Sequence, residues 1–144
     1  MWRKRISSFC PAARFAAPAT ESAISSIGVS LAVDVPRDLL SVLRESDGVE
    51  GDYGLGLIWC AERIVADNLR FRSSTDFQEL YMPFDCLVFF ADAGNGDQFA
   101  YSVTGGAIRR DDVFVWNHET DSRAWVAPNL ATYLEWWLTG KIKT

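Results

Sequence analysis

Two segments near the start of the chain carry apolar side chains at helical spacing. The first predicts a short helix, and one face of that helix holds Trp2, Ile6 and Phe9. The second predicts a helix over residues 21–32, with the hydroxyl of Thr20 as its N-terminal cap. Its apolar face holds Ile24, Ile27 and Leu31. Both helices are therefore expected to bury one side against the rest of the protein.

A third helix and a final helix are predicted from the same kind of pattern. Pro36 stands where a first helical residue is favoured, and Gly48 is expected to cap the end of the third helix. Leu39, Leu40 and Leu43 follow Pro36 at helical spacing. Near the end of the chain, Asn129 is a good cap for a helix that Gly140 closes. The apolar side of this last helix holds Leu130, Tyr133, Leu134, Trp137 and Leu138.

Short apolar runs between turn-forming residues predict strands in the rest of the chain. We expect them near residues 55–60, 86–91, 97–103, 113–117 and 123–127. The last four follow one another across short turns, which is typical of an antiparallel meander rather than of β-α-β units. Residues 61–82 are expected to mix short helical pieces with polar loop. The predicted fold class is therefore α+β, with N-terminal helices, a central antiparallel meander sheet and a C-terminal helix packed on one face.

The length of 144 residues favours a single domain. We expect residues 1–19 to be a helix and an Ala/Pro-rich connector docked on a domain of residues 20–144. A membrane-surface helix would need a longer apolar face. No apolar core of a signal peptide follows the basic start, although the Arg- and Ser-containing composition also fits an organellar transit peptide. No apolar run approaches the ~20 residues of a membrane span.

The charge is unevenly distributed along the chain. The formal net charge is -5, but residues 1–20 hold four basic residues and no acidic one, so the rest of the chain carries -9. Such an acidic body would repel the phosphates that supply most non-specific affinity for nucleic acid. It suits a basic protein partner, because opposite fields accelerate encounter. The sequence therefore predicts a protein partner, with no nucleic acid and no membrane.

The three cysteines indicate neither a disulfide framework nor a zinc site. Cys10, Cys60 and Cys86 are odd in number and widely spaced, with no Cys-x-x-Cys pair. A reducing cytoplasmic location fits this usage. Cys86 begins an apolar run and is expected to be a small buried side chain.

The candidate chemical groups lie in turns. His118 is the single histidine, so a helical two-histidine zinc motif is absent and a hydrogen-bonding role in a turn is favoured. Asp92 and Asp97 flank a Gly-Asn-Gly turn, where carboxylates commonly bond nearby backbone N–H groups. A cation site or an acid–base pair at these two residues is the alternative. No catalytic residue, metal or cofactor is expected.

An ordered series of weak motifs resembles the SUKH superfamily. The motifs are Pro36-Arg-Asp-Leu-Leu-Ser-Val-Leu-Arg-Glu-Ser-Asp-Gly48, Leu57-Ile-Trp59, residues 84–97, residues 116–123 and the closing Trp-rich helix. The resemblance covers roughly residues 20–140. It departs from the usual pattern at Ala32, where members often have Gly, and at Val35, where they often have Leu before Pro. This superfamily includes Smi/Knr-type regulators of fungal cell-wall assembly and many bacterial immunity proteins.

The resemblance implies binding rather than catalysis. It favours an immunity protein that neutralises a cognate polymorphic toxin, such as a nuclease or deaminase, by direct binding. The alternative is a regulatory or scaffold protein with an endogenous cytoplasmic partner, and a metal or small-ligand binder is favoured less. Because the body is acidic, we expect partner contacts at the acidic turns. These residues are Glu50, Asp52, Asp92, Asp97, Asp111, Asp112, Glu119 and Asp121.

Overall fold

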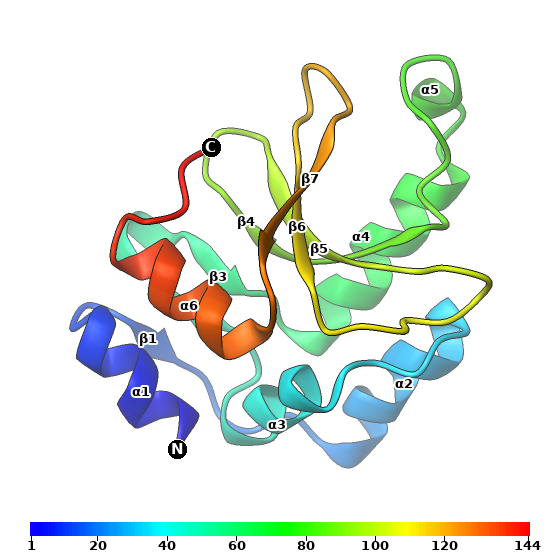
Figure 1. The fold of residues 1–144 in the computed structure, drawn as a ribbon. Helices are drawn as coiled ribbons and strands as arrows, with labels where there is room; N and C mark the ends of the chain where they lie inside the picture. Colours follow the sequence, from blue (N-terminus) through cyan, green and yellow to red (C-terminus); the bar gives the residue numbers. More distant parts are fainter.

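A four-stranded antiparallel sheet forms the centre of the computed structural model, which describes residues 1–144 (Figure 1). Its strands follow the chain order β4-β5-β6-β7, so the predicted meander is confirmed. Their bounds are β4 Leu87–Asp92, β5 Gln98–Ser102, β6 Val113–Trp116 and β7 Arg123–Ala127. A smaller three-stranded sheet consists of β1 Arg14–Phe15, β2 Val49–Glu50 and β3 Gly56–Ile58.

Six α-helices surround these sheets, which confirms the α+β class. They are α1 Trp2–Phe9, α2 Glu21–Leu31, α3 Arg37–Glu45, α4 Ala61–Ser73, α5 Thr75–Gln78 and α6 Leu130–Leu138. A 3-10 turn, η1 Asp52–Gly54, joins β2 to β3. None of these helices is long and apolar enough to traverse a lipid bilayer.

The predicted caps of α2 and α6 are confirmed. Thr20 Oγ1 accepts a hydrogen bond from the Ala23 N–H at 3.1 Å, and Asn129 Oδ1 accepts one from the Thr132 N–H at 2.8 Å. The end of α3 differs from the prediction, because the C-cap is Ser46 in an extended conformation. Gly48 instead allows the chain to turn into β2 at a φ of +93°.

Helix α4 corrects the prediction for residues 61–82. It is one continuous helix of 13 residues. Its buried face combines Ile64 and Phe71 with the polar Asn68, which obscured the apolar pattern. Asn68 is buried because its side chain bonds both backbone groups of Phe89 on β4, at 2.9 Å and 2.8 Å.

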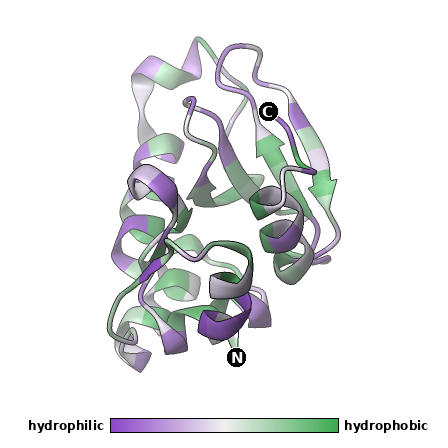
Figure 2. Ribbon diagram, turned by 90° about the vertical axis from the view of Figure 1, so that its left-hand side faces the viewer, coloured by the Kyte–Doolittle hydropathy of each residue, from purple (hydrophilic) through white to green (hydrophobic).

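The two faces of the large sheet are covered by different helices. On one face, Phe71 of α4 packs against Phe89 and Trp116, with ring centroids 5.2 Å and 5.7 Å away. On the other face, Tyr133 of α6 packs against Phe90 at 5.5 Å. Consecutive residues of a strand point to opposite faces, so α4 and α6 enclose the sheet between them. Figure 2 shows green stretches within the strands of this sheet and purple along several of the connecting loops.

The N-terminal helix packs on the rest of the molecule. Trp2 and Ile6 are buried in the common core, and Trp2 Nε1 donates to Ser41 Oγ at 2.9 Å. Glu45 of α3 accepts hydrogen bonds from the first backbone N–H groups of α1, at Trp2 and Arg3. A carboxylate in this position satisfies N–H groups that have no partner within the helix.

Candidate functional site

The fold brings most of the acidic turns to one end of the large sheet. The β4–β5 turn and the β6–β7 turn lie at the same end because alternate turns of a meander do so (Figure 1). They are adjacent: a Cβ on Gly96 would lie 2.8 Å from the ring of His118. The η1 turn adjoins them, since a Cβ on Gly94 would lie 3.3 Å from Leu55. We call this region the acidic end and define it by Glu50, Asp52, Asp92, Asp97, Glu119 and Asp121.

Asp111 and Asp112 do not belong to the acidic end. They lie in the β5–β6 connection, which is at the opposite end of the meander (Figure 1). Asp112 is largely buried, and burial would raise its pKa, but hydrogen bonds from Arg110 and Trp125 lower it on balance. Asp111 is exposed and forms no ion pair. The eight acidic residues that the sequence suggested therefore form two separate groups.

Asp92 is held within the protein. Its two carboxylate oxygens accept hydrogen bonds from Arg63 of α4 at 2.9 Å and 3.0 Å. Burial acts to lower the pKa of Arg63, but its hydrogen bonds to Asp92 and Asp67 outweigh this and raise the pKa. The guanidinium also lies 4.0 Å from the ring centre of Trp59. Asp92 therefore fixes the start of the β4–β5 turn to α4.

Asp97 joins the two neighbouring turns. It is buried, and its Oδ1 accepts the backbone N–H of His118 at 3.0 Å and lies 2.7 Å from His118 Nδ1. His118 thus lies in the β6–β7 turn, as the sequence predicted. Across the described chain, no group of three His, Cys, Asp or Glu side chains is close enough to hold a metal ion.

Asp121 is likewise an internal acceptor. It accepts hydrogen bonds from the Met82 N–H at 2.8 Å, Trp116 Nε1 at 2.8 Å and Arg123 at 3.0 Å. Burial would raise its pKa, but these three donors outweigh the burial and hold the pKa below the ordinary value. The residue adopts a φ of +59°, which the surrounding hydrogen bonds stabilise.

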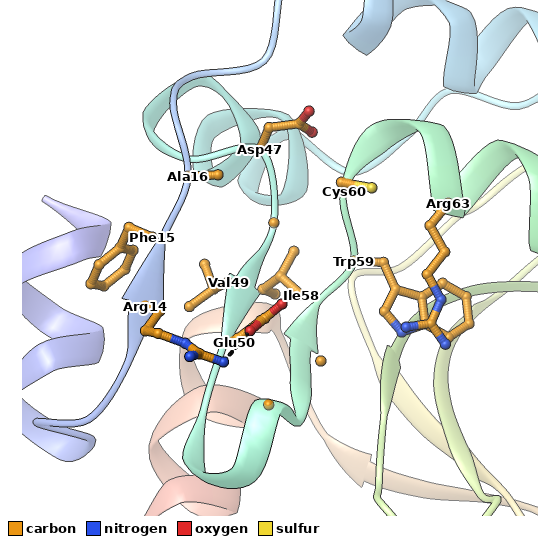
Figure 3. Close-up of a pocket in the computed structure, with 13 residues that line it drawn as sticks. Arg14, Phe15, Ala16, Asp47, Val49, Glu50, Ile58, Trp59, Cys60 and Arg63 are labelled. Atoms are coloured by element: carbon orange, nitrogen blue, oxygen red, sulfur yellow. Dashed lines mark hydrogen bonds and ion pairs between the residues drawn. The ribbon is translucent and has the colours of Figure 1, made fainter.

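Three carboxylates of the acidic end remain accessible. Asp52 is exposed and forms no ion pair, and the side chain of Glu119 is 79% exposed. Glu50 is also exposed and pairs with Arg14 at 2.6 Å (Figure 3). Glu50, Asp52 and Glu119 are therefore the carboxylates of this end that a partner can reach.

A cavity of about 330 Å³ lies beside Glu50, between the small sheet and the start of α4. Figure 3 shows Arg14 and Glu50 on one side of it and Trp59 with Arg63 on another. The indole Nε1 of Trp59 is buried and has no hydrogen-bond acceptor. At the far end of the cavity, Asp47 Oδ1 accepts the Ala61 N–H at 2.9 Å and so begins α4.

The exposure of two side chains was not predicted from the sequence. Cys86 is exposed rather than buried, because β4 begins one residue later, and its Sγ lies 3.0 Å from Arg123 Nη1. Tyr53 is fully exposed at the tip of η1, and the sequence analysis did not single it out. An aromatic residue in the sequence Gly51-Asp52-Tyr53-Gly54 was the available signal, since such loops present side chains to solvent.

The Trp residues of the C-terminal helix divide as helical geometry requires. Trp137 packs on Phe99 with ring centroids 5.1 Å apart. Trp136 instead faces the exposed Trp125 at 6.4 Å and Lys141, whose Nζ lies 4.2 Å from the ring centre. This pair forms a small aromatic surface beside β7.

The meander with helices on both faces places this protein among small α+β domains built on an antiparallel sheet. The family model described as SMI1-KNR4 cell-wall matches residues 21–134. The chain belongs to this family and thereby to the SUKH superfamily, as its motifs suggested, and members of the superfamily are generally protein-interaction modules. No curated protein matched the chain.

Proposed function

We propose that this protein is a non-catalytic binding module that neutralises a cognate toxin domain by direct contact. The observation that carries the proposal is the membership of a superfamily of interaction modules, together with accessible carboxylates gathered at one end. Glu50, Asp52 and Glu119 suit a basic surface such as the substrate-binding face of a nuclease or deaminase. In this proposal residues 20–144 form the binding domain, residues 1–19 are a docked extension, and the protein acts in the cytoplasm.

The carboxylates that accept hydrogen bonds within the protein have a supporting role in this proposal. Asp92, Asp97 and Asp121 hold the turns in place, so that the accessible carboxylates are presented on an ordered surface. An ordered surface loses little conformational entropy on binding. Asp111 and Asp112 lie at the other end and are not part of the proposed interface.

A regulatory or scaffold role with an endogenous partner is the second candidate. The SMI1-KNR4 description of the matching family favours it, because the regulators of cell-wall assembly belong to that group. The genetic neighbourhood distinguishes the two roles. An immunity gene is expected directly downstream of a gene for a large secreted toxin, whereas a regulator has no such requirement.

Capture from the native host tests the proposal. The tagged full-length chain is purified from host lysate at moderate salt, and stoichiometric companions are identified by mass spectrometry and then recombined in pure form. A basic toxin domain that forms a 1:1 complex and loses its toxicity would support neutralisation. An endogenous regulator as the companion would contradict it and favour the second role.

A further inference from the structure

Tyr53 has a conformation and an exposure that the fold itself does not explain. Its φ of +58° lies in the left-handed region, which a residue with a Cβ disfavours. The residue is 108% exposed relative to the reference state and therefore buries no surface in the fold. Gly or Asn would adopt this backbone more easily. The stability of the folded chain is therefore no reason for a tyrosine at this position.

The backbone around Tyr53 is held in place. The N–H of Gly51 donates to the carbonyl of Leu55 at 2.7 Å, and the N–H of Leu55 donates to the carbonyl of Asp52 at 3.2 Å. Gly51 packs closely on Leu57, whose side chain lies 3.1 Å from the position of an added Cβ. Tyr53 is thus presented on an ordered turn. An aromatic ring with only two side-chain torsions loses little entropy when it is covered.

Two hollows border the turn. One is the 330 Å³ cavity of Figure 3, and the other is a hollow of about 360 Å³ lined by Ala12, Arg14 and residues 51–54. Arg14 and Gly54 line both hollows. Tyr53 lines the second hollow, so a partner segment has room beside the tyrosine.

The charge beside Tyr53 is negative and accessible. Asp52 is exposed without an ion pair, and Glu50 lies two residues earlier at the cavity, paired with Arg14. A Lys or Arg side chain of a partner can pack its methylene groups on the tyrosine ring while its charged group stays within reach of both the ring and Asp52. A partner guanidinium can also compete with Arg14 for Glu50.

We propose that the turn of residues 51–54 anchors the partner, and that Tyr53 and Asp52 together receive a Lys- or Arg-bearing segment of a protein. The inference rests on the proposed function, because it takes a protein to be the ligand, and it names the residues that make the central contact. Aromatic residues surrounded by near-neutral contacts commonly carry most of the energy of an interface.

A nuclear magnetic resonance titration tests this proposal without the natural partner. The ¹⁵N-labelled full chain is titrated with a short peptide of alternating Gly and Lys, and in parallel with the equivalent Gly/Glu peptide. Tyr53→Asn removes the ring and keeps a residue that tolerates the left-handed backbone. Asp52→Asn removes the charge. Asp111→Asn is the matched control, because Asp111 is also exposed and unpaired but lies at the opposite end.

The expected result is that the Lys peptide shifts the amide signals of residues 50–57 most, and that the Glu peptide shifts none. Tyr53→Asn and Asp52→Asn should each lower the affinity for the Lys peptide about tenfold. The control should bind like the wild type. Thermal unfolding should show that Tyr53→Asn is at least as stable as the wild type, which separates a binding role from a structural one.

Three results would overturn the proposal. They are absence of any shift at millimolar peptide, shifts centred on other carboxylates such as Glu119, and equal affinity in Tyr53→Asn. Each of these leaves the proposed function standing, because a partner captured from the host can bind through another face. Failure to recover any partner in that separate capture would instead count against the proposed function.

Discussion

At the scale of single residues, tertiary partners decide which carboxylates are free. Asp92 is paired with Arg63, 29 residues away in the chain, and Asp97 with His118, 21 residues away. Such partners are invisible to local sequence patterns. The sequence correctly placed Asp92 and Asp97 on either side of a turn, but only the structure separates accessible carboxylates such as Asp52 from carboxylates that hold the turns together.

Asp121 is one of the carboxylates that make stability depend on pH in the acid range. Its pKa in the folded state is lowered, so its contribution to stability is complete above the ordinary aspartate pKa and is lost as the pH falls through the lower folded value. We expect Asp121→Asn to reduce the free energy of unfolding at neutral pH by about 1–3 kcal/mol. The variant should also lose less stability than the wild type on acidification below about pH 4.

Urea unfolding at a series of pH values measures both effects of Asp121→Asn. Asp111→Asn is the matched control, because Asp111 is exposed and has no hydrogen bonds like those that Asp121 accepts. Parallel curves of stability against pH for wild type and Asp121→Asn would contradict the account.

At the scale of elements, regular patterns predicted the fold and irregular ones did not. The strands of the meander and the helices α2, α3 and α6 have clear periodicity and turn residues, and they were found within a few residues of the prediction. Helix α4 was missed because a buried polar residue interrupts its apolar face. Strands β1 and β2 have two residues each, too few to show any alternation.

Asn68 takes the place of a neighbouring strand at the outer edge of β4. Its amide nitrogen donates to the Phe89 carbonyl and its oxygen accepts the Phe89 N–H. Asn68→Ala leaves two buried backbone groups without partners, and we expect it to lower the free energy of unfolding by roughly 3 kcal/mol. Alanine is the better helix former, so the loss cannot come from helix propensity.

Chemical denaturation of the Asn68 variants measures this contribution. Asn68→Asp serves as the comparison, because a carboxylate restores an acceptor for the Phe89 N–H but offers no donor to the carbonyl. An unchanged midpoint for Asn68→Ala would contradict this account, because it would show that the hydrogen bonds between Asn68 and Phe89 add nothing to stability.

At the scale of the whole molecule, the meander determines where charge is presented. Its alternate turns place Glu119 at the end that adjoins the η1 turn, which carries Asp52, while Asp111 stays at the other end. A sequence analysis that counts charges gives a net charge but not this division. The predicted acidic surface is therefore smaller than the sequence suggested, and it lies beside the cavity and the exposed Tyr53.

Binding through the acidic end should depend on ionic strength. Because the three accessible carboxylates are solvent-exposed, a rise in salt screens them from a basic partner and slows association. We expect the association rate with the captured partner to fall by about tenfold or more between low and physiological salt. Stopped-flow mixing measures this rate. A rate that does not change with salt would contradict an electrostatic encounter.

The most direct test of the central claim is a calorimetric titration of the captured partner into three forms of the full chain at low salt. The first is the wild type, the second carries Glu50→Gln, Asp52→Asn and Glu119→Gln together, and the third carries Asp111→Asn alone as the control. The account predicts a 1:1 complex for the wild type and the control, and an affinity at least about tenfold lower for the triple variant. Equal affinity for all three forms would contradict the claim that this protein binds its partner through the acidic end.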